Sequence, residues 1–525
     1  MKFMSERHRL LLRVTIAMLG TLIFTLSQAE SAIVKAKSVS LADVVSAIRL
    51  AHESDTVVVP AGNASWTSTL RVTKGITLEG AGDDKTVILD DVPRTPLNDG
   101  GAILIADLNS KQSFRLTGIT FRAGALTTTG NNGAVRIRGT CPAVRIDHCH
   151  FDGLHQLCVH TYGCIFGVID HCIFDCARRS LAILVWHDTW GGKFYGDGSW
   201  AEPPYFGSEK FLFIEDNTFN NLGLKQTNGN IDAKRGARYV CRYNKFNNCK
   251  PANHGTEGGR ERGCRVMEIY NNTFNWTMPN NGGISRSGTV LLHDNTFTGT
   301  KPSKGMSFQT FREFFPYRPW GGANGYNAWD VNDSHGLYLS GKHTGTNDSQ
   351  ALVVADAGWK TNQWVGYQVT NKVSGHNSLI KANTSDTISP FIYTDTRKPL
   401  RFNTGDTFVI YKVLISLDQP GRGQGDLLSG STPSNTVTNS IAWPHNALEP
   451  GYSWNNKYGT ERVYDIHADS RKTFQENRDF YNNTPKPGYK PYTYPHPLVN
   501  GTAVPAKNTA QDQLRTTDAV SSLSK

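Results

Sequence analysis

A short pattern of apolar and polar residues recurs six times between residues 141 and 300. Each copy has an apolar residue five positions before a phenylalanine, a mostly polar residue next, and Asn or Cys two positions before the phenylalanine. The phenylalanines are Phe151, Phe174, Phe219, Phe246, Phe274 and Phe297, at intervals of 23, 45, 27, 28 and 23 residues. A period near 25 residues with one doubled interval predicts stacked units that bury their apolar faces against one another.

Within each copy, the alternation of apolar and polar positions predicts a strand with one buried face. The Asn or Cys that follows predicts a turn, because Asn side chains hydrogen-bond turn backbone and tolerate left-handed φ. Stacking at the strand spacing of about 4.8 Å would align these positions in a ladder. The ladder consists of Cys149, Cys172, Asn217, Asn244, Asn272 and Asn295, and we interpret it as structural.

From residue 40 to about 300 the chain resembles the right-handed parallel β-helices of the pectate-lyase superfamily. The resemblance implies an all-β solenoid. The apolar positions Leu41, Val44, Val45 and Ile48 predict a short amphipathic helix before the first coil. Such a helix would cap the open end of the solenoid and cover its unpaired edge.

The chain divides into five predicted segments. Residues 1–29 form a signal peptide and residues 30–310 the β-helix. Residues 311–415 form a small β-rich module, inserted or appended, because apolar and polar positions alternate between turn signals. Residues 416–500 contain a further coil, near Gly451–Asn456, and a proline-rich tail laid on the surface. Residues 501–525 are expected to be disordered.

The first 29 residues predict export. Three arginines precede the apolar run 14–26, and Ser27-Gln28-Ala29 provides a small-residue cleavage site. We therefore expect a secreted protein, extracellular or periplasmic. No later stretch has the apolar length of a membrane span, so none is expected in the mature chain.

The net charge indicates an anionic partner. It is +10 for the full chain, and removing the four basic residues and one acidic residue of the leader leaves +7. Export and the lack of a basic run or nucleic-acid motif argue against nucleic acid. An acidic polysaccharide bound by a monomeric protein is the favoured interpretation. The alternative is that the excess of Lys and Arg only solubilises the surface.

All nine cysteines lie between residues 141 and 264, inside the repeat. The odd number prevents complete pairing. No metal-binding spacing is present, so we expect buried packing with one or two disulfides, which export permits.

A second row of side chains lies about ten residues before each ladder position. It contains Arg138, His160, Tyr162, Asp232, Lys234, His254 and Arg286. This predicts a cationic stripe along one face of the solenoid. An isolated basic residue on a strand often only discourages aggregation, whereas several in register favour a binding function.

The doubled interval between Phe174 and Phe219 contains an aromatic loop with many glycines and prolines. Trp186 and Trp200 are its candidate sugar-binding residues, because flat aromatic rings suit sugar stacking. The alternative is that these rings pack the loop onto the solenoid.

Two segments of the stripe resemble the chondroitinase B and alginate lyase branch of the superfamily. That pattern has a catalytic lysine about ten residues before an N-x-F turn and an Arg-His-Gly one coil later. Lys234 precedes Asn244 by ten residues, and Asn253-His254-Gly255 matches the second motif with Asn in place of Arg. Arg260 or Arg262 would then have to replace the missing arginine.

The resemblance implies β-elimination on a uronate polymer. Neighbouring cations would favour the neutral amine of Lys234 that a base requires. Arg262, with Arg260 or Arg235, would hold the substrate carboxylate, and His254 would relay a proton. Arg138, His160 and Arg265 would bind more of the polymer. A Ca²⁺ ion is possible, with Asn230, Asp232 and Glu257 as hard oxygen ligands.

Two other classes stay open. A glycoside hydrolase would use two carboxylates among Asp170, Glu215 and Asp232. A non-catalytic surface protein would only bind glycan through the stripe and the aromatic loop. Parallel β-helices carry many activities, so the fold does not choose among them.

Overall fold

The computed structural model describes residues 31–178, 181–223, 229–255, 261–278, 282–302, 304–309, 337–364, 368–391, 399–411, 418–425, 446–462, 465–468 and 474–501. The expected signal peptide 1–29, the expected tail beyond residue 501, and the candidates Glu257 and Arg260 lie outside the described residues.

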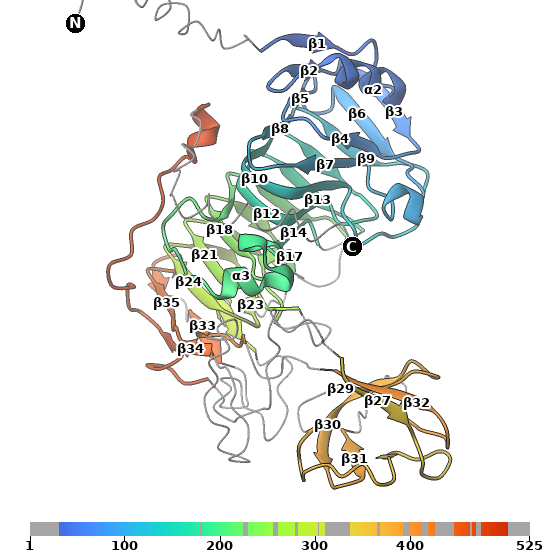
Figure 1. Cartoon of the computed structure of the whole chain (residues 1–525). Coiled ribbons are helices and arrows are strands. Elements are labelled where there is room, and N and C mark those ends of the chain that lie inside the picture. Colours follow the sequence, from blue (N-terminus) through green and yellow to red (C-terminus); the bar gives the residue numbers. More distant parts are fainter. Residues whose placement is uncertain are drawn as a thin grey trace, which may run out of the picture.

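The predicted parallel β-helix is confirmed, and its coils have three faces (Figure 1). The 17-stranded sheet supplies two of them, because its long strands β10 and β12 bend from one face to the next. It contains β1 (Ile33–Lys35), β2 (Thr56–Val58), β4 (Leu70–Val72), β5 (Thr77–Glu79), β7 (Leu104–Leu108), β8 (Ser113–Thr117), β10 (Val135–Asp147), β12 (Val159–Asp170), β14 (Ile183–Trp186), β15 (Leu212–Glu215), β17 (Gly229–Lys234), β18 (Arg238–Arg242), β20 (Lys250–Pro251), β21 (Val266–Tyr270), β24 (Thr289–His293), β35 (Gly451–Trp454) and β39 (Phe480–Tyr481).

We name the faces by their strands. The first face contains β4, β7, the first halves of β10 and β12, β14, β17 and β20. A bridge between Ala252 and Ile284 extends it to β23 (Gly283–Ser285), β26 (Met306–Phe308) and β38 (Ile466–Ala468). The second face contains β1, β2, β5, β8, the second halves of β10 and β12, β15, β18, β21, β24, β35 and β39.

The third face is a separate sheet of 11 strands. Its strands are β3 (Gly62–Trp66), β6 (Thr86–Asp90), β9 (Thr120–Ala123), β11 (His150–Asp152), β13 (Ile173–Cys176), β16 (Thr218–Asn221), β19 (Lys245–Asn247), β22 (Thr273–Trp276), β25 (Thr296–Gly299), β36 (Lys457–Tyr458) and β37 (Glu461–Arg462). The repeated phenylalanines lie here on the inner side, and neighbouring rings from Phe121 to Phe297 stack with centroids 4.7 to 5.5 Å apart.

The predicted ladder forms inside the turn between the second and third faces. Asn244 accepts a hydrogen bond at Oδ1 from the backbone N–H of Asn217 (3.0 Å), and its Nδ2 donates to the Ile214 carbonyl (2.8 Å). Each buried amide thereby satisfies backbone groups of the adjacent coil. Left-handed φ occurs one residue earlier than expected, at His148, His171, Asp216, Tyr243, Asn271, Asp294 and Asn455 (φ 50° to 57°), which turns the ladder side chain inward.

The nine cysteines are buried, as expected. All are free thiols in this structure, so the one or two expected disulfides are not present. All of them except Cys164 belong to the hydrophobic core of the solenoid.

Helix α2 (Leu41–Leu50) lies at the N-terminal end of the solenoid, as predicted (Figure 1). Ser40 caps it by accepting a hydrogen bond from the backbone N–H of Asp43 (3.3 Å). Val44, Ala47 and Ile48 form its buried side. The other helical segments within the described ranges are η1 (Pro96–Asn98), η2 (Trp190–Gly192), η3 (Phe194–Gly196), α3 (Asp197–Trp200) and η4 (Pro497–Asn500).

A six-stranded antiparallel sheet forms between the last two coils in sequence. Its strands are β27 (Leu337–Lys342), β28 (Leu352–Val353), β29 (Gln368–Asn371), β30 (Asn377–Asn383), β31 (Thr387–Pro390) and β32 (Thr407–Tyr411). A hairpin of β33 (Arg422–Gly425) and β34 (Asn446–Leu448) follows. The solenoid then resumes, because β35 pairs in parallel with β24.

Candidate functional site

Side chains from successive coils form an outer row on the first face. Tyr162, Trp186 and Lys234 come from β12, β14 and β17, and Trp186 pairs in register with Lys234. The residues that alternate with them, Val185 and Ala233, are buried in the core. This alternation points the row away from the core. The turn after β17 adds Arg235, at φ 54°.

Lys234 and Arg235 both bind the carboxylate of Glu261. The Lys234 Nζ lies 3.0 Å from Glu261 Oε2, and the Arg235 guanidinium contacts Oε1. The three side chains are 20%, 16% and 19% exposed, respectively. The predicted crowding of cations is therefore balanced by a carboxylate at the surface.

Trp186 supports both cations. The Arg235 guanidinium lies 3.9 Å and the Lys234 Nζ 5.0 Å from the centroid of its ring. Tyr162 and His160 contact the same indole at centroid distances of 5.3 and 4.5 Å. Trp186 was predicted to stack on sugar, but the guanidinium already covers its ring, and the contact is a cation–π interaction that orients Arg235.

A buried carboxyl, Asp188, lies behind this group. Its Oδ2 is 3.4 Å from Arg235 Nη1, and Tyr162 lies nearby. Burial raises the pKa of Asp188, although Arg235 and Tyr162 partly oppose the shift. Burial and Asp188 likewise raise the pKa of Tyr162. The pair can hold or pass a proton next to the exposed cations.

His254 completes the group from the next coil. Its backbone N–H donates to the Ala233 carbonyl (2.9 Å), which places it beside Lys234. Its Nδ1 lies 2.5 Å from Asp232 Oδ2, and its side chain is 33% exposed. The structure thus brings together Lys234, Arg235, His254, Asp232 and Trp186 from the predicted set.

Three predicted residues are instead buried in the framework. Both terminal edges of the Arg262 guanidinium are occupied, by Asp418 at 2.7 Å and Asp197 at 3.3 Å. Arg265 binds Glu449 at 2.6 Å. The Trp200 Nε1 donates to the Gly263 carbonyl (2.8 Å). All three side chains are nearly inaccessible.

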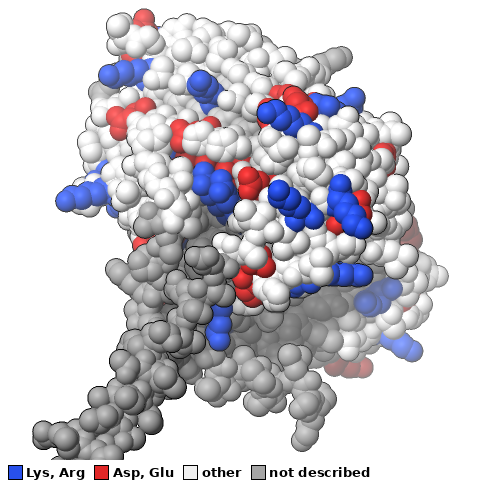
Figure 2. Space-filling view, turned by 90° about the horizontal axis from the view of Figure 1, so that it is seen from above, with Lys and Arg blue, Asp and Glu red and all other residues white. Residues whose placement is uncertain are grey.

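Arg138 and His160 lie further along the first face. Arg138 is 25% exposed and forms a two-point ion pair with Asp107 at 2.6 and 2.8 Å. His160 is buried, and burial together with Arg136 lowers its pKa to about 3, so the ring is neutral. Figure 2, which shows the molecule from above the view of Figure 1, likewise shows Lys and Arg side chains beside Asp and Glu side chains on the described surface.

The aromatic loop is partly packed and partly exposed. Trp190 and Trp200 are buried, whereas Phe194 is 61% and Tyr195 37% exposed. The Tyr195 carbonyl accepts a hydrogen bond from the backbone N–H of Arg262 (3.0 Å), so Tyr195 lies beside Glu261 at the rim of the site. These two rings are better placed for sugar stacking than Trp186 or Trp200.

The expected calcium ligands do not fit a cation site. Asn230 is buried, and its Oδ1 accepts a hydrogen bond from the Lys250 backbone (3.0 Å). Asp232 is engaged by the Ala233 N–H and by His254. Glu257 lies outside the described residues. We therefore assign no catalytic step to a metal.

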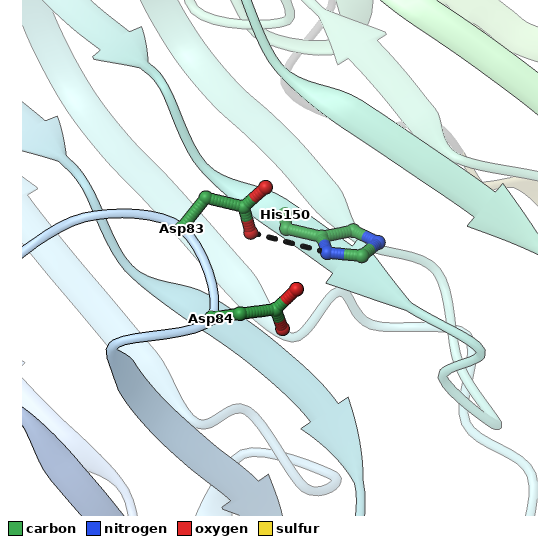
Figure 3. Close-up of side chains that lie close together, drawn as sticks. All are labelled: Asp83, Asp84 and His150. Atoms are coloured by element: carbon green, nitrogen blue, oxygen red, sulfur yellow. Dashed lines mark ion pairs between the residues drawn. The ribbon is translucent and has the colours of Figure 1, made fainter.

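A different group with metal-binding geometry lies near β11, where Asp83, Asp84 and His150 face one another (Figure 3). His150 Nδ1 is 3.2 Å from Asp83, and Arg122 Nη2 is 2.6 Å from Asp84. Arg122 already pairs with one of the two carboxylates, and we assign no ion to this group.

Of the three carboxylates proposed for a hydrolase, Asp232 lies on the first face, whereas Asp170 and Glu215 lie on the second face and are covered. Asp170 binds Arg145 at 2.8 Å and Glu215 binds Arg242 at 2.6 Å, and both carboxylates are fully buried. The segment 489–501, which we name the strap, covers them, since Arg242 also donates to the carbonyls of Tyr492 and Thr493. The expectation that Asp170 and Glu215 are available to substrate is wrong for this reason.

Asp188, Glu261 and Tyr195 were missed by the sequence analysis. Asp188 lies two residues after the end of β14, within the recognised aromatic interval. Glu261 lies in the segment 254–265 that was noted for its cations, and Tyr195 belongs to the recognised aromatic loop. Their positions depend on how two long loops meet, which the repeat does not determine.

No protein-family model matches the sequence, and no curated protein matches it. Among solved structures it is similar to an alginate lyase from Paenibacillus sp. str. FPU-7, at 15% identity and a TM-score of 0.31, covering 51% of this chain and 97% of that one. It is similar to a PL6 family alginate lyase, AlyGC, at 13% identity and a TM-score of 0.30, covering 53% of this chain and 39% of that one.

A third similar structure is a tailspike protein, gp49, from the Acinetobacter baumannii bacteriophage Fri1, described as a capsular polysaccharide depolymerase. Identity is 10% and the TM-score 0.26, covering 72% of this chain and 83% of that one. These TM-scores are low, so the parallel β-helix rests on the observed strand pairing. Among the described residues, no helix has the length and apolar character needed to cross a membrane.

Proposed function

We propose that this protein is an exported polysaccharide lyase that cleaves an acidic, uronate-containing polysaccharide by β-elimination. The single observation that carries the proposal is the group of Lys234 and Arg235 around a carboxylate, in the exposed row of the first face. A uronate offers the same carboxylate chemistry as the Glu261 side chain that these cations bind.

β-Elimination needs a base, a carboxylate clamp and a proton donor. Lys234 is a cation while it is paired with Glu261 and must first give up a proton to solvent; as the free amine it then removes the proton from the carbon α to the substrate carboxylate. The electrons of that C–H bond form the new carbon–carbon double bond, and the bond from the β carbon to the glycosidic oxygen breaks. Arg235 neutralises the carboxylate and stabilises the charge that develops on it.

The leaving oxygen takes a proton from His254, whose ring is held by Asp232. The positions of Tyr162 and Asp188 support a second route for a proton behind Arg235. Arg262 and Arg265 hold the loops around the site instead of contacting substrate. Phe194 and Tyr195 provide exposed rings for a neighbouring sugar, and Arg138 extends the contact along the face.

The test is ultraviolet absorbance over time with the mature protein and alginate, pectate, chondroitin or heparin-like polymer. An unsaturated uronic end absorbs, so a rise on one polymer establishes the lyase and its substrate. Parallel tubes with calcium and with chelator test whether a calcium ion takes part. No rise in absorbance on any polymer, together with new reducing ends in the same tubes, would instead establish a hydrolase.

The second candidate is a glycoside hydrolase on the same face. Asp188, whose raised pKa suits a general acid, favours it, with Asp232 as the second carboxylate. A protein that binds acidic glycan without cleaving it would leave no new ends in either assay.

A further inference from the structure

Glu261 occupies the position where the proposed function needs substrate. Its two carboxylate oxygens are bound separately, Oε2 by Lys234 and Oε1 by Arg235. The proposed clamp and base are therefore both engaged by a side chain of this protein. A substrate carboxylate cannot take the same hydrogen bonds until Glu261 leaves.

The neighbouring residue, Arg262, forms a fully buried ion pair that can be compared with the pairs of Glu261. The Arg262–Asp418 pair is 1% and 0% exposed, and Asp418 also accepts a hydrogen bond from the backbone N–H of Gly263 (3.1 Å). Glu261 is 19% exposed, and the hydrogen bonds described for its carboxylate come from the two site cations. A partly exposed ion pair contributes less to stability than its geometry suggests, because solvent screens it.

The backbone that carries Glu261 is anchored. The N–H of Arg262 is bound by the Tyr195 carbonyl at 3.0 Å, and the Arg262 side chain is fixed by Asp418. A change of rotamer at Glu261 alone can therefore open the two cations, without movement of the loop.

We infer that Glu261 is an internal stand-in for the substrate carboxylate, which a bound uronate displaces from Lys234 and Arg235. The inference rests on the proposed function. It explains how two adjacent cations remain satisfied in the empty protein. It also supplies selectivity, because only a ligand with its own carboxylate compensates the cations for the loss of Glu261, so a neutral sugar gains nothing from displacing it.

The test compares Glu261→Gln with the wild-type protein. Glutamine keeps the shape of the side chain and removes the charge that competes. The matched control is Glu461→Gln, which removes a carboxylate paired with Lys301, exposed and on the third face. The probes are monomeric galacturonate, mannuronate and glucuronate, which cannot be cleaved, and the corresponding neutral sugars. Binding is followed by chemical-shift titration at fixed ionic strength.

Glu261→Gln is expected to bind the preferred uronate about fivefold more tightly than wild type, the equivalent of losing one partly exposed ion pair. Glu461→Gln and the neutral sugars should show no change. Glu261→Asp, which is one methylene shorter, should give a smaller increase and provides the same comparison should the glutamine variant fold poorly.

Equal or weaker uronate binding by both Glu261 variants, with clear binding by wild type, would overturn the inference and leave the proposed function standing. In that case Glu261 would position the cations instead of competing for them. Failure of wild type and all variants to bind any uronate would overturn the proposed function and the inference with it.

Discussion

The first and second faces of the solenoid both carry ion pairs of basic and acidic residues, but these pairs differ in how far they are buried. On the second face, Arg242 and Glu215 are completely buried, and the strap completes the hydrogen bonds of the guanidinium. On the first face, Lys234, Arg235 and Glu261 stay partly exposed and bind one another. The charges are similar, so what separates structure from function is whether the chain itself covers them.

The difference lies in how fully each charge is satisfied. Arg242 donates to Glu215, to the Tyr270 hydroxyl and to two carbonyls of the strap. Such a pair is costly to break, because a buried charge would lose its partner. The first-face cations can exchange one carboxylate for another at little cost, which is what binding an acidic ligand requires.

The largest expected effect is on the first face. Lys234→Ala should lower lyase activity about a thousandfold, since a positioned base contributes roughly 10² to 10⁴ in rate. Ultraviolet absorbance on the responsive polymer measures this loss. The matched control is Lys245→Ala, which removes an exposed lysine from β19 on the third face. Full activity in Lys234→Ala would remove the lysine from the mechanism.

Glu215→Gln should have a large effect on stability and little on activity. The change leaves the buried Arg242 without its counter-charge, and we expect a loss of about 3 kcal/mol. Glu261→Gln, the same substitution on the first face, should cost about 1 kcal/mol or less. Denaturant unfolding of the two variants side by side measures both. Similar losses would mean that the two faces do not differ as described.

The last expected effect is a dependence of stability on pH that originates under the strap. Glu268 accepts hydrogen bonds from the Tyr489 hydroxyl (2.5 Å) and the Gly207 N–H (2.9 Å), and burial raises its pKa from 4.5 to about 7. The folded state therefore binds this proton more tightly than the unfolded state. Protonated Glu268 therefore adds to the free energy of unfolding below pH 4.5. This contribution, up to about 3 kcal/mol, is lost as pH rises towards 7.

Glu268→Gln cannot ionise, so it should lack this loss. Its melting temperature relative to wild type should rise between pH 4.5 and 8 and change little below that range. A constant difference at all pH values would show that Glu268 does not titrate across this interval.

The sequence predicted the coil and part of the site. Six copies of one pattern were enough to identify the ladder and the stacked phenylalanines, because each copy repeats the same local contacts. The stripe also placed Lys234 and His254 on one face, since strand register carries their side chains together. In both cases the information is local or periodic.

The incorrect predictions concern residues whose contact partners lie far away in the sequence. Glu261 and Arg262 are neighbours in a charged segment, and either could have faced the ligand. Arg262 is buried because Asp418, 156 residues later, binds it. Asp170 and Glu215 are covered because the strap returns to the second face from the end of the chain. No pattern within the repeat predicts these contacts.

The ladder continues across a large gap in the sequence. The Asn295 N–H donates to Asn456 Oδ1 at 3.1 Å, although 161 residues separate them. Adjacent coils of the solenoid are therefore joined by the same ladder hydrogen bond whether the chain between them is short or long. This boundary is a natural place for exchange of genetic material: a module can enter or leave between these two asparagines while both ladder partners remain. The cost of a longer connection grows only slowly with length. Such a boundary would let an ancestral β-helix acquire new modules while the strand pairing of its first face stayed the same.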